Sequence, residues 1–209
     1  MSYYKKLKLP FPLKDSHTLE KLVDLKKNPT NSLSLYDTVI TDYAQYLNTE
    51  LLQVFEKLQV DVSIMLFLGY PDNRPLNQQM HVDIQFDGTQ WQPVCCALNW
   101  EFNLSYITMS WYENSANLLS IEPPVAVSRT GMYSGRHFGH RGNKSTDGFT
   151  LLDTYCPTMD APVLIRTDVP HKVIMHPKES RRLCLSLRFS NIHTWEHAQK
   201  IFKNFAYET

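Results

Sequence analysis

From residue 60 onward, long stretches of the chain alternate hydrophobic and polar residues with a period of two, which is typical of half-buried β-strands. In the clearest stretch, every second residue from Val62 to Leu68 is apolar, and the run stops at the turn signal Gly-Tyr-Pro-Asp, 69–72. The same alternation predicts strands at 80–86, 93–101, 106–112, 150–155, 162–166, 172–175 and 182–189. Short strands at nearly regular spacing predict an all-β sandwich or barrel core.

Helical spacing is found only toward the two ends of the chain. A proline-punctuated extended arm precedes a short helix predicted at 19–26, and a long helix is predicted at 36–58. The long helix rests on apolar residues at three- and four-residue steps, namely Tyr36, Ile40, Tyr43, Leu47, Leu51, Val54, Phe55 and Leu58. A last helix begins near Thr194, a suitable N-cap. The predicted fold class is therefore mainly β, with helical support at 1–59, a β core at 60–190 and a C-terminal helix at 191–209, all in a single domain, 1–209.

Three residues could form a metal site. His81 and Asp83 are two apart in a predicted strand, so their side chains project from the same face. His171 follows Pro170, which holds the preceding residue extended and leaves the histidine at the start of the next strand. Two imidazoles and one carboxylate are the ligand set of a non-haem Fe(II) oxygenase. The His-x-Asp pair alone has a simpler alternative, a histidine beside a surface carboxylate.

The strand predicted at 182–189 has one apolar face and one polar face. Its apolar residues are Leu183, Leu185, Leu187 and Phe189, and its polar row consists of Arg182, Cys184, Ser186 and Arg188. If the polar row faces a barrel interior, a buried guanidinium there requires an anion. The fork of an arginine suits a carboxylate held by two hydrogen bonds.

This combination resembles the Fe(II)/2-oxoglutarate-dependent oxygenases, which are built on a double-stranded β-helix of jelly-roll type. The matched pattern is His-x-Asp, a distal histidine, and an arginine at the start of the last core strand, and it covers roughly residues 60 to 190. Segments 97–100 and 162–167 also resemble strands of that family. The resemblance implies a jelly-roll core with flanking N-terminal helices and a C-terminal helix. It also implies that Fe(II) binds to His81, Asp83 and His171.

The resemblance further implies that 2-oxoglutarate and O₂ are co-substrates and that 2-oxoglutarate is converted to succinate and CO₂. The distal carboxylate of 2-oxoglutarate is expected on Arg182, although the adjacent Arg181 and the inward Arg188 remain alternatives, and Asn99 is expected beside the co-substrate. Because Asp83 fills the position that a halide occupies in related halogenases, hydroxylation or demethylation is expected. The expected substrate is a small molecule, an amino acid or a peptidyl group.

A cupin-like jelly roll, which would bind a small molecule or use a metal without oxidation, is the alternative of another class. The cupin pattern would place a second histidine where Asp83 stands and a glutamate just beyond it, and the sequence has neither. It would also leave Arg182 without a partner.

The composition bears on the partners and the cellular compartment of the protein rather than on its chemistry. The 209 residues contain 21 basic and 21 acidic side chains, so the net charge does not favour a nucleic-acid or membrane partner. The four cysteines form no CxxC motif and indicate a reducing compartment. No apolar run is long enough to span a bilayer, and the N-terminus lacks the apolar core of a signal peptide. We therefore expect a cytoplasmic protein.

The segment 128–148 holds five of the seven glycines, and it carries four basic residues against one acidic residue. In the resembled fold, its position between strands places it near the open end of the barrel, which predicts a lid over the iron, with Arg136 and Arg141 contacting an anionic substrate. The alternative is a solvated loop whose charge serves solubility. Trp111 and Tyr106 are further candidates for lining the substrate pocket, although such residues are more often part of a core.

Overall fold

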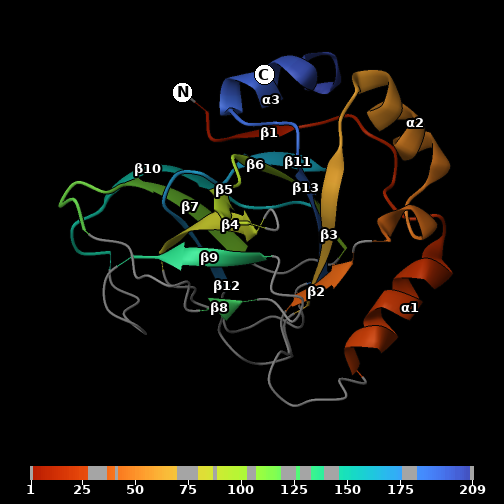
Figure 1. Ribbon diagram of the computed structural model, residues 1–209, viewed down its shortest axis with the longest axis horizontal. Helices are drawn as coiled ribbons and strands as arrows, with labels where there is room; N and C mark the ends of the chain where they lie inside the picture. Colours follow the sequence, from red (N-terminus) through yellow and green to blue (C-terminus); the bar gives the residue numbers. More distant parts are fainter. Residues whose placement is uncertain are drawn as a thin grey trace.

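The computed structural model describes residues 2–27, 37–40, 42–69, 80–86, 89–102, 107–118, 126–127, 133–138, 146–175 and 183–207, and these form two antiparallel sheets (Figure 1). In order across the first sheet lie β1 (Tyr4–Lys6), β11 (Val163–Arg166), β6 (Cys96–Glu101), β13 (Leu183–Phe189), β3 (Val62–Gly69) and β2 (Asp37–Ile40). The second sheet has the order β10 (Thr150–Tyr155), β7 (Ile107–Glu113), β12 (His171–Met175), β4 (His81–Phe86), β9 (Tyr133–His137) and β8 (Ala126–Val127), and β5 (Trp91–Pro93) also pairs with β4. This arrangement confirms the predicted fold class, a mainly β core of jelly-roll type.

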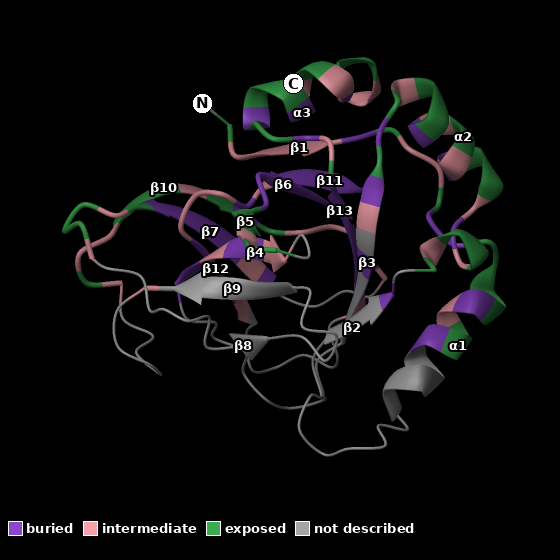
Figure 2. Ribbon diagram, viewed as in Figure 1, coloured by how far each residue is buried: buried purple, intermediate pink, exposed green. Residues whose placement is uncertain are grey.

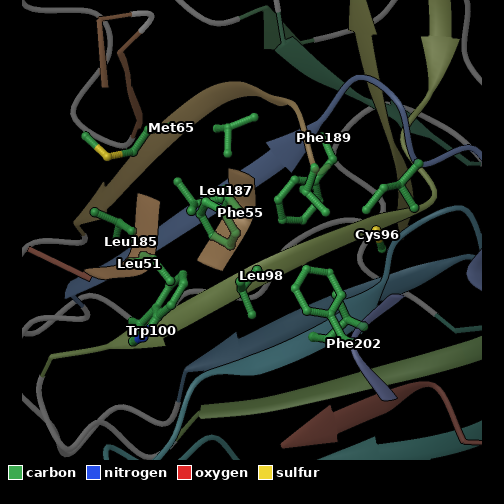
Figure 3. Packing of buried hydrophobic residues seen from close by; sticks show 14 of the residues in the cluster. Leu51, Phe55, Met65, Cys96, Leu98, Trp100, Leu185, Leu187, Phe189 and Phe202 are labelled. Atoms are coloured by element: carbon green, nitrogen blue, oxygen red, sulfur yellow. The ribbon is translucent and has the colours of Figure 1, made fainter. Parts of the chain in front are cut away.

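Helices cover the outer face of the first sheet. These are α1 (Ser16–Lys27), α2 (Thr49–Leu58) and α3 (Trp195–Ile201), with short 3₁₀ turns η1 (Tyr43–Gln45) and η2 (Lys203–Phe205) beside them. Figure 3 shows Leu51 and Phe55 of α2 packed with Leu185 and Leu187 of β13, and all four side chains are at most 3% exposed. A second apolar cluster fills the space between the sheets, with residues such as Met109 contributed by the second sheet. Among the described residues, the central strands of the first sheet are largely buried (Figure 2).

The two faces of β13 lie as the alternation predicts. Leu185 and Leu187 belong to the helix-covered cluster, whereas Cys184, Ser186 and Arg188 are buried on the other side of the strand. The predicted N-cap of the last helix is also confirmed, because the side chain of Thr194 accepts a hydrogen bond from the His197 backbone N–H. The polar row of the last core strand thus faces the interior of the jelly roll.

The prediction of one long helix at 36–58 is wrong in its first half. Residues Asp37–Ile40 form strand β2, which pairs with β3, and the helix α2 begins only at Thr49. Three consecutive β-branched residues in β2, Thr38 to Ile40, favour the strand. The side chain of Asn48 then accepts a hydrogen bond from Glu50 N–H and starts the helix there.

Two further strands lie where irregular chain was expected. The N-terminal arm forms β1, which pairs with β11. The segment predicted as a lid contains β9, whose backbone pairs with β4 in the register Val82↔Arg136, so this part of it is a strand of the second sheet. Residues 128–132 and 139–145 of that segment are outside the described residues. In the described part of the chain, no helix is both long and apolar enough to cross a membrane.

Candidate metal centre

Strand pairing brings the three predicted metal ligands together. His81 and Asp83 lie on the same face of β4, and His171, the first residue of β12, stands directly opposite His81 in the antiparallel register. Their side-chain donor atoms all lie within 4.8 Å of one another, and the residues are 9%, 2% and 3% exposed, respectively. Asp83 Oδ1 lies 3.7 Å from Nε2 of each histidine, which is longer than a hydrogen bond. The three donors therefore face a common point.

The imidazole of His171 is oriented by the backbone. Its Nδ1 lies 2.9 Å from the carbonyl oxygen of Val169, so Nδ1–H donates and Nε2 keeps its lone pair toward Asp83. Burial lowers the pKa of His171 below its ordinary value, and the nearby carboxylate of Asp83 opposes this shift only in part. Burial, the largest cause of the shift, thus favours the neutral ring, which is the form that binds a metal.

Backbone hydrogen bonds join Asp83 to the segments that follow β11 and precede β6. The Asp83 N–H donates to the carbonyl of Thr167 at 3.0 Å, and the Asp83 carbonyl accepts from the Val94 N–H at 3.0 Å. Thr167 closes the ring, because its hydroxyl donates to the Val94 carbonyl at 2.6 Å. The carboxylate of Asp83 thus projects from a backbone that is fixed on both sides.

A chain of buried polar side chains crosses from the first sheet to Asp83. Arg188 Nη2 donates to Asp83 Oδ2 at 2.7 Å, and the two side chains are 4% and 2% exposed. Arg188 Nη1 donates to the hydroxyl of Ser186, which in turn donates to Oδ1 of Asn99. Because Oδ2 is held by the guanidinium, Oδ1 is the oxygen that faces the two histidines.

The donor set fits Fe(II) and similar ions. Two imidazole nitrogens and one carboxylate oxygen on one side of an ion are the facial arrangement of non-haem Fe(II) enzymes. Among the residues that the structure describes, no fourth His, Cys, Asp or Glu joins this cluster. An ion held by these three side chains would keep its remaining positions open for oxygen donors from small molecules.

The structure describes only some of the other predicted site residues. Asn99 and Arg188 belong to the polar chain just described, whereas Arg181, Arg182, Arg141 and Tyr106 are outside the described residues. Arg136 is placed only by its backbone in β9. Sequence analysis assigned no role to Ser186 or Thr167, although the alternation in β13 did place Ser186 on the inner face.

Trp111 occupies the core rather than a pocket. Its side chain is 0% exposed, its indole N–H donates to the Arg166 carbonyl at 2.7 Å, and its ring stacks on Tyr3 and Tyr4 of the N-terminal arm. The buried position of Trp111 therefore does not support the predicted contact with a substrate. Burial and a hydrogen-bonded indole account for this residue.

A cavity of about 460 Å³ is lined by residues near the metal ligands in sequence, although none of the three ligands lines it. Three of its lining residues are connected to the site: Gln85 follows Asp83 on the same face of β4, the Val94 N–H donates to the Asp83 carbonyl, and Ser190 lies two residues past Arg188. The full lining is Gln85, Gln92, Pro93, Val94, Phe189, Ser190, Ile192 and His193. The volume is within the usual range for small-molecule sites.

Comparisons with known proteins give distant similarity only. No model of a known family matches the sequence, and no curated protein matches it. The chain is similar to the solved structure of EvdMO1 at 11% identity and a TM-score of 0.42, over 90% of this chain and 48% of that one, so it spans about half the length of EvdMO1. It is also similar to a prolyl-4-hydroxylase from Pseudomonas putida at 14% identity and a TM-score of 0.39, over 90% of this chain and 91% of that one. With two antiparallel sheets and a buried cluster of His81, Asp83 and His171, the chain resembles the Fe(II)/2-oxoglutarate-dependent oxygenases.

Proposed function

We propose that this protein is a non-haem Fe(II)- and 2-oxoglutarate-dependent oxygenase that hydroxylates or demethylates a small-molecule, amino-acid or peptidyl substrate. The observation that carries the proposal is the convergence of His81, Asp83 and His171 on one buried point between the sheets. A surface carboxylate beside a histidine, the simpler alternative for His-x-Asp, does not account for two inward imidazoles and a carboxylate that is 2% exposed.

In this proposal the three side chains hold the iron, and the protein contributes binding and orientation. Iron, O₂ and 2-oxoglutarate supply the oxidation when bound, and 2-oxoglutarate is converted to succinate and CO₂. His171 is kept in the tautomer that offers Nε2 by its bond to the Val169 carbonyl. Asp83 is kept with Oδ1 toward the histidines by Arg188. Deep burial of the donors excludes bulk water from the centre.

The distal carboxylate of 2-oxoglutarate is assigned to Arg182, which directly precedes β13. Arg188 is the less suitable anchor because its guanidinium already donates to Asp83 and to Ser186, next to the iron ligands. Asn99 lies on the inner face between these two ends of β13, paired with Ser186, and would line the co-substrate site.

The cavity lined by Gln85 and Val94 is the proposed site of the primary substrate. Gln85 lies on the same face of β4 as Asp83, and the Val94 N–H donates to the Asp83 carbonyl. A substrate held there would contact Gln85, two positions from Asp83, and the two glutamines and Ser190 offer both donors and acceptors. Contacts from Arg136 and Arg141 to an anionic substrate remain a separate prediction.

The test combines binding with turnover. Purified protein loaded with Fe(II) under anaerobic conditions should, on admission of O₂ and 2-oxoglutarate, form one succinate for each 2-oxoglutarate consumed. His81→Ala should abolish both iron binding and succinate formation. A suitable control is His17→Ala, because His17 also lies beside a carboxylate, 3.1 Å from Glu20, but on the exposed face of α1.

The cupin-like alternative predicts another result in the same assay. Metal would bind, but 2-oxoglutarate would neither raise the thermal midpoint of the metal-loaded protein nor be consumed. In the oxygenase, stabilisation by 2-oxoglutarate should be present in the parent protein and lost in Arg182→Ala.

A further inference from the structure

The second sheet buries a lysine on its outer face. Lys172 follows His171 in β12, so its side chain projects from the face opposite to the metal ligands. The next residue, Val173, belongs to the apolar cluster between the sheets, which confirms that Lys172 points outward. Lys172 is nevertheless only 6% exposed. A lysine is almost never buried to this extent unless its charge is paired, so this burial needs an explanation.

The contacts of this ammonium group do not neutralise it. Its Nζ lies 5.8 Å from the centre of the Tyr112 ring. Among the described residues, no carboxylate pairs with Lys172 Nζ and no oxygen accepts a hydrogen bond from it. Burial lowers the pKa of Lys172 below its ordinary value, and no charge of the described residues opposes this shift. Because an aromatic ring offsets only part of the cost of burying an ammonium group, the cation lacks a counter-charge.

Two hydroxyl groups lie in line with Lys172 across the sheet, where β12, β7 and β10 are neighbours (Figure 1). Ser110 of β7 stands directly opposite Lys172, and Thr154 of β10 stands directly opposite Ser110. Residues that stand opposite each other share a face, and their Cβ atoms are about 4.5–5.5 Å apart. The hydroxyl oxygens of Ser110 and Thr154 are 3.3 Å apart. Ser110 is 4% exposed and Thr154 is exposed, so the row leads from the protein surface to the buried ammonium group.

This row of side chains has the chemistry of an oxyanion site. An ammonium group has three N–H donors and each hydroxyl has one O–H donor, and the oxygens of a carboxylate or a phosphate accept such bonds. A metal cation would be repelled by the ammonium group. A neutral ligand would leave the charge of Lys172 uncompensated, and only an anion removes that cost.

We propose that Lys172, Ser110 and Thr154 form a binding site for a small oxyanion, a carboxylate or a phosphate group, on the outer face of the second sheet. The anion supplies the counter-charge that Lys172 lacks, and the two hydroxyls donate hydrogen bonds to its oxygens. The site is separate from the candidate metal centre, because His171 and Lys172 project from opposite faces of β12. It does not depend on the proposed function.

The test follows Lys172 itself by nuclear magnetic resonance in protein whose lysine side chains carry ¹³C. The Cε signal of Lys172 is identified by its loss in Lys172→Met. Sodium phosphate, sodium acetate or both should shift this signal along a saturable curve, whereas sodium chloride at the same ionic strength should not. Saturation by phosphate alone assigns a phosphate group as the ligand, and saturation by acetate alone assigns a carboxylate.

Variants decide whether the proposed side chains bind the anion, with the affinity measured by calorimetry. Lys172→Met should weaken binding at least about tenfold, the effect of losing a hydrogen bond to a charged group, and Ser110→Ala should weaken it about threefold to tenfold. Lys6→Met is the matched control, because Lys6 already has a carboxylate partner, Asp160 Oδ2 at 3.5 Å. It should leave the affinity unchanged.

Lys172→Met should fold, because methionine replaces an uncompensated buried charge with an apolar side chain of similar length. If it does not fold, Ser110→Ala decides, since it removes a single oxygen atom. The proposal is overturned if neither anion shifts the Lys172 signal, or if chloride shifts it to the same extent. Unchanged affinity in folded Lys172→Met, or in Ser110→Ala where that variant decides, overturns it as well.

Discussion

Replacing Arg188 with methionine should lower the free energy of unfolding of the metal-free protein by about 3–5 kcal/mol, because it leaves a buried carboxylate without its counter-charge. The structure supplies a matched pair for comparison. Arg188 and Asp83 are 2.7 Å apart with side chains 4% and 2% exposed, and Arg166 and Asp168 are also 2.7 Å apart but 20% and 27% exposed. Since solvent screens the second pair, Arg166→Met should cost about 0–1 kcal/mol.

The assay is urea unfolding of the metal-free protein for both variants and for the double variant Asp83→Leu/Arg188→Met. The double variant should be more stable than Arg188→Met alone, because removing both charges leaves no buried charge without compensation. If Arg188→Met and Arg166→Met cost the same within about 1 kcal/mol, burial does not set the strength of the inner pair and the reasoning is refuted. A double variant less stable than Arg188→Met alone would refute it as well.

Three further predictions concern His171, Trp111 and the glycine-rich segment. Since burial lowers the pKa of His171, the unfolded chain binds more protons than the folded one near the ordinary histidine pKa of about 6.5. The metal-free protein should therefore lose stability as the pH falls through that value. Unfolding measured at several pH values should show a weaker pH dependence for His171→Leu. Trp111→Phe should lower the free energy of unfolding, measured in urea, by about 2 kcal/mol through a lost hydrogen bond and lost packing, and it should leave the substrate KM unchanged. A raised KM at unchanged stability would instead make Trp111 a substrate contact. The double variant Arg136→Ala/Arg141→Ala should raise the KM for an anionic substrate, while turnover of 2-oxoglutarate without substrate continues. An unchanged KM would show that the lid prediction is wrong.

The strands of the core and the ligands on them were predictable because their signals are local. A period of two decides which residues share a face, so the sequence alone placed His81 with Asp83 and placed Ser186 and Arg188 on the inner side of β13. That His171 stands opposite His81 is a matter of strand pairing, for which the sequence offered only the resemblance to a family.

The misplaced elements were those whose conformation depends on distant partners. Residues 37–40 fit a helical stripe in sequence, but the edge of β3 provides a pairing site and makes them a strand. The same holds for β9, which pairs with β4 although its segment is rich in glycine. The polar chain from Asn99 through Ser186 and Arg188 to Asp83 joins residues up to 105 positions apart, and no local pattern encodes such contacts.

The most direct measurement for the whole account is a crystal structure of the protein loaded with Fe(II) and 2-oxoglutarate under anaerobic conditions, with the iron located by its anomalous scattering. The account predicts one iron bonded to Nε2 of His81, Nε2 of His171 and Oδ1 of Asp83, with the oxo acid in its open positions. Oδ2 of Asp83 should remain bonded to Arg188. Iron at another place, or no iron in a protein that is otherwise folded as described, would contradict the central claim.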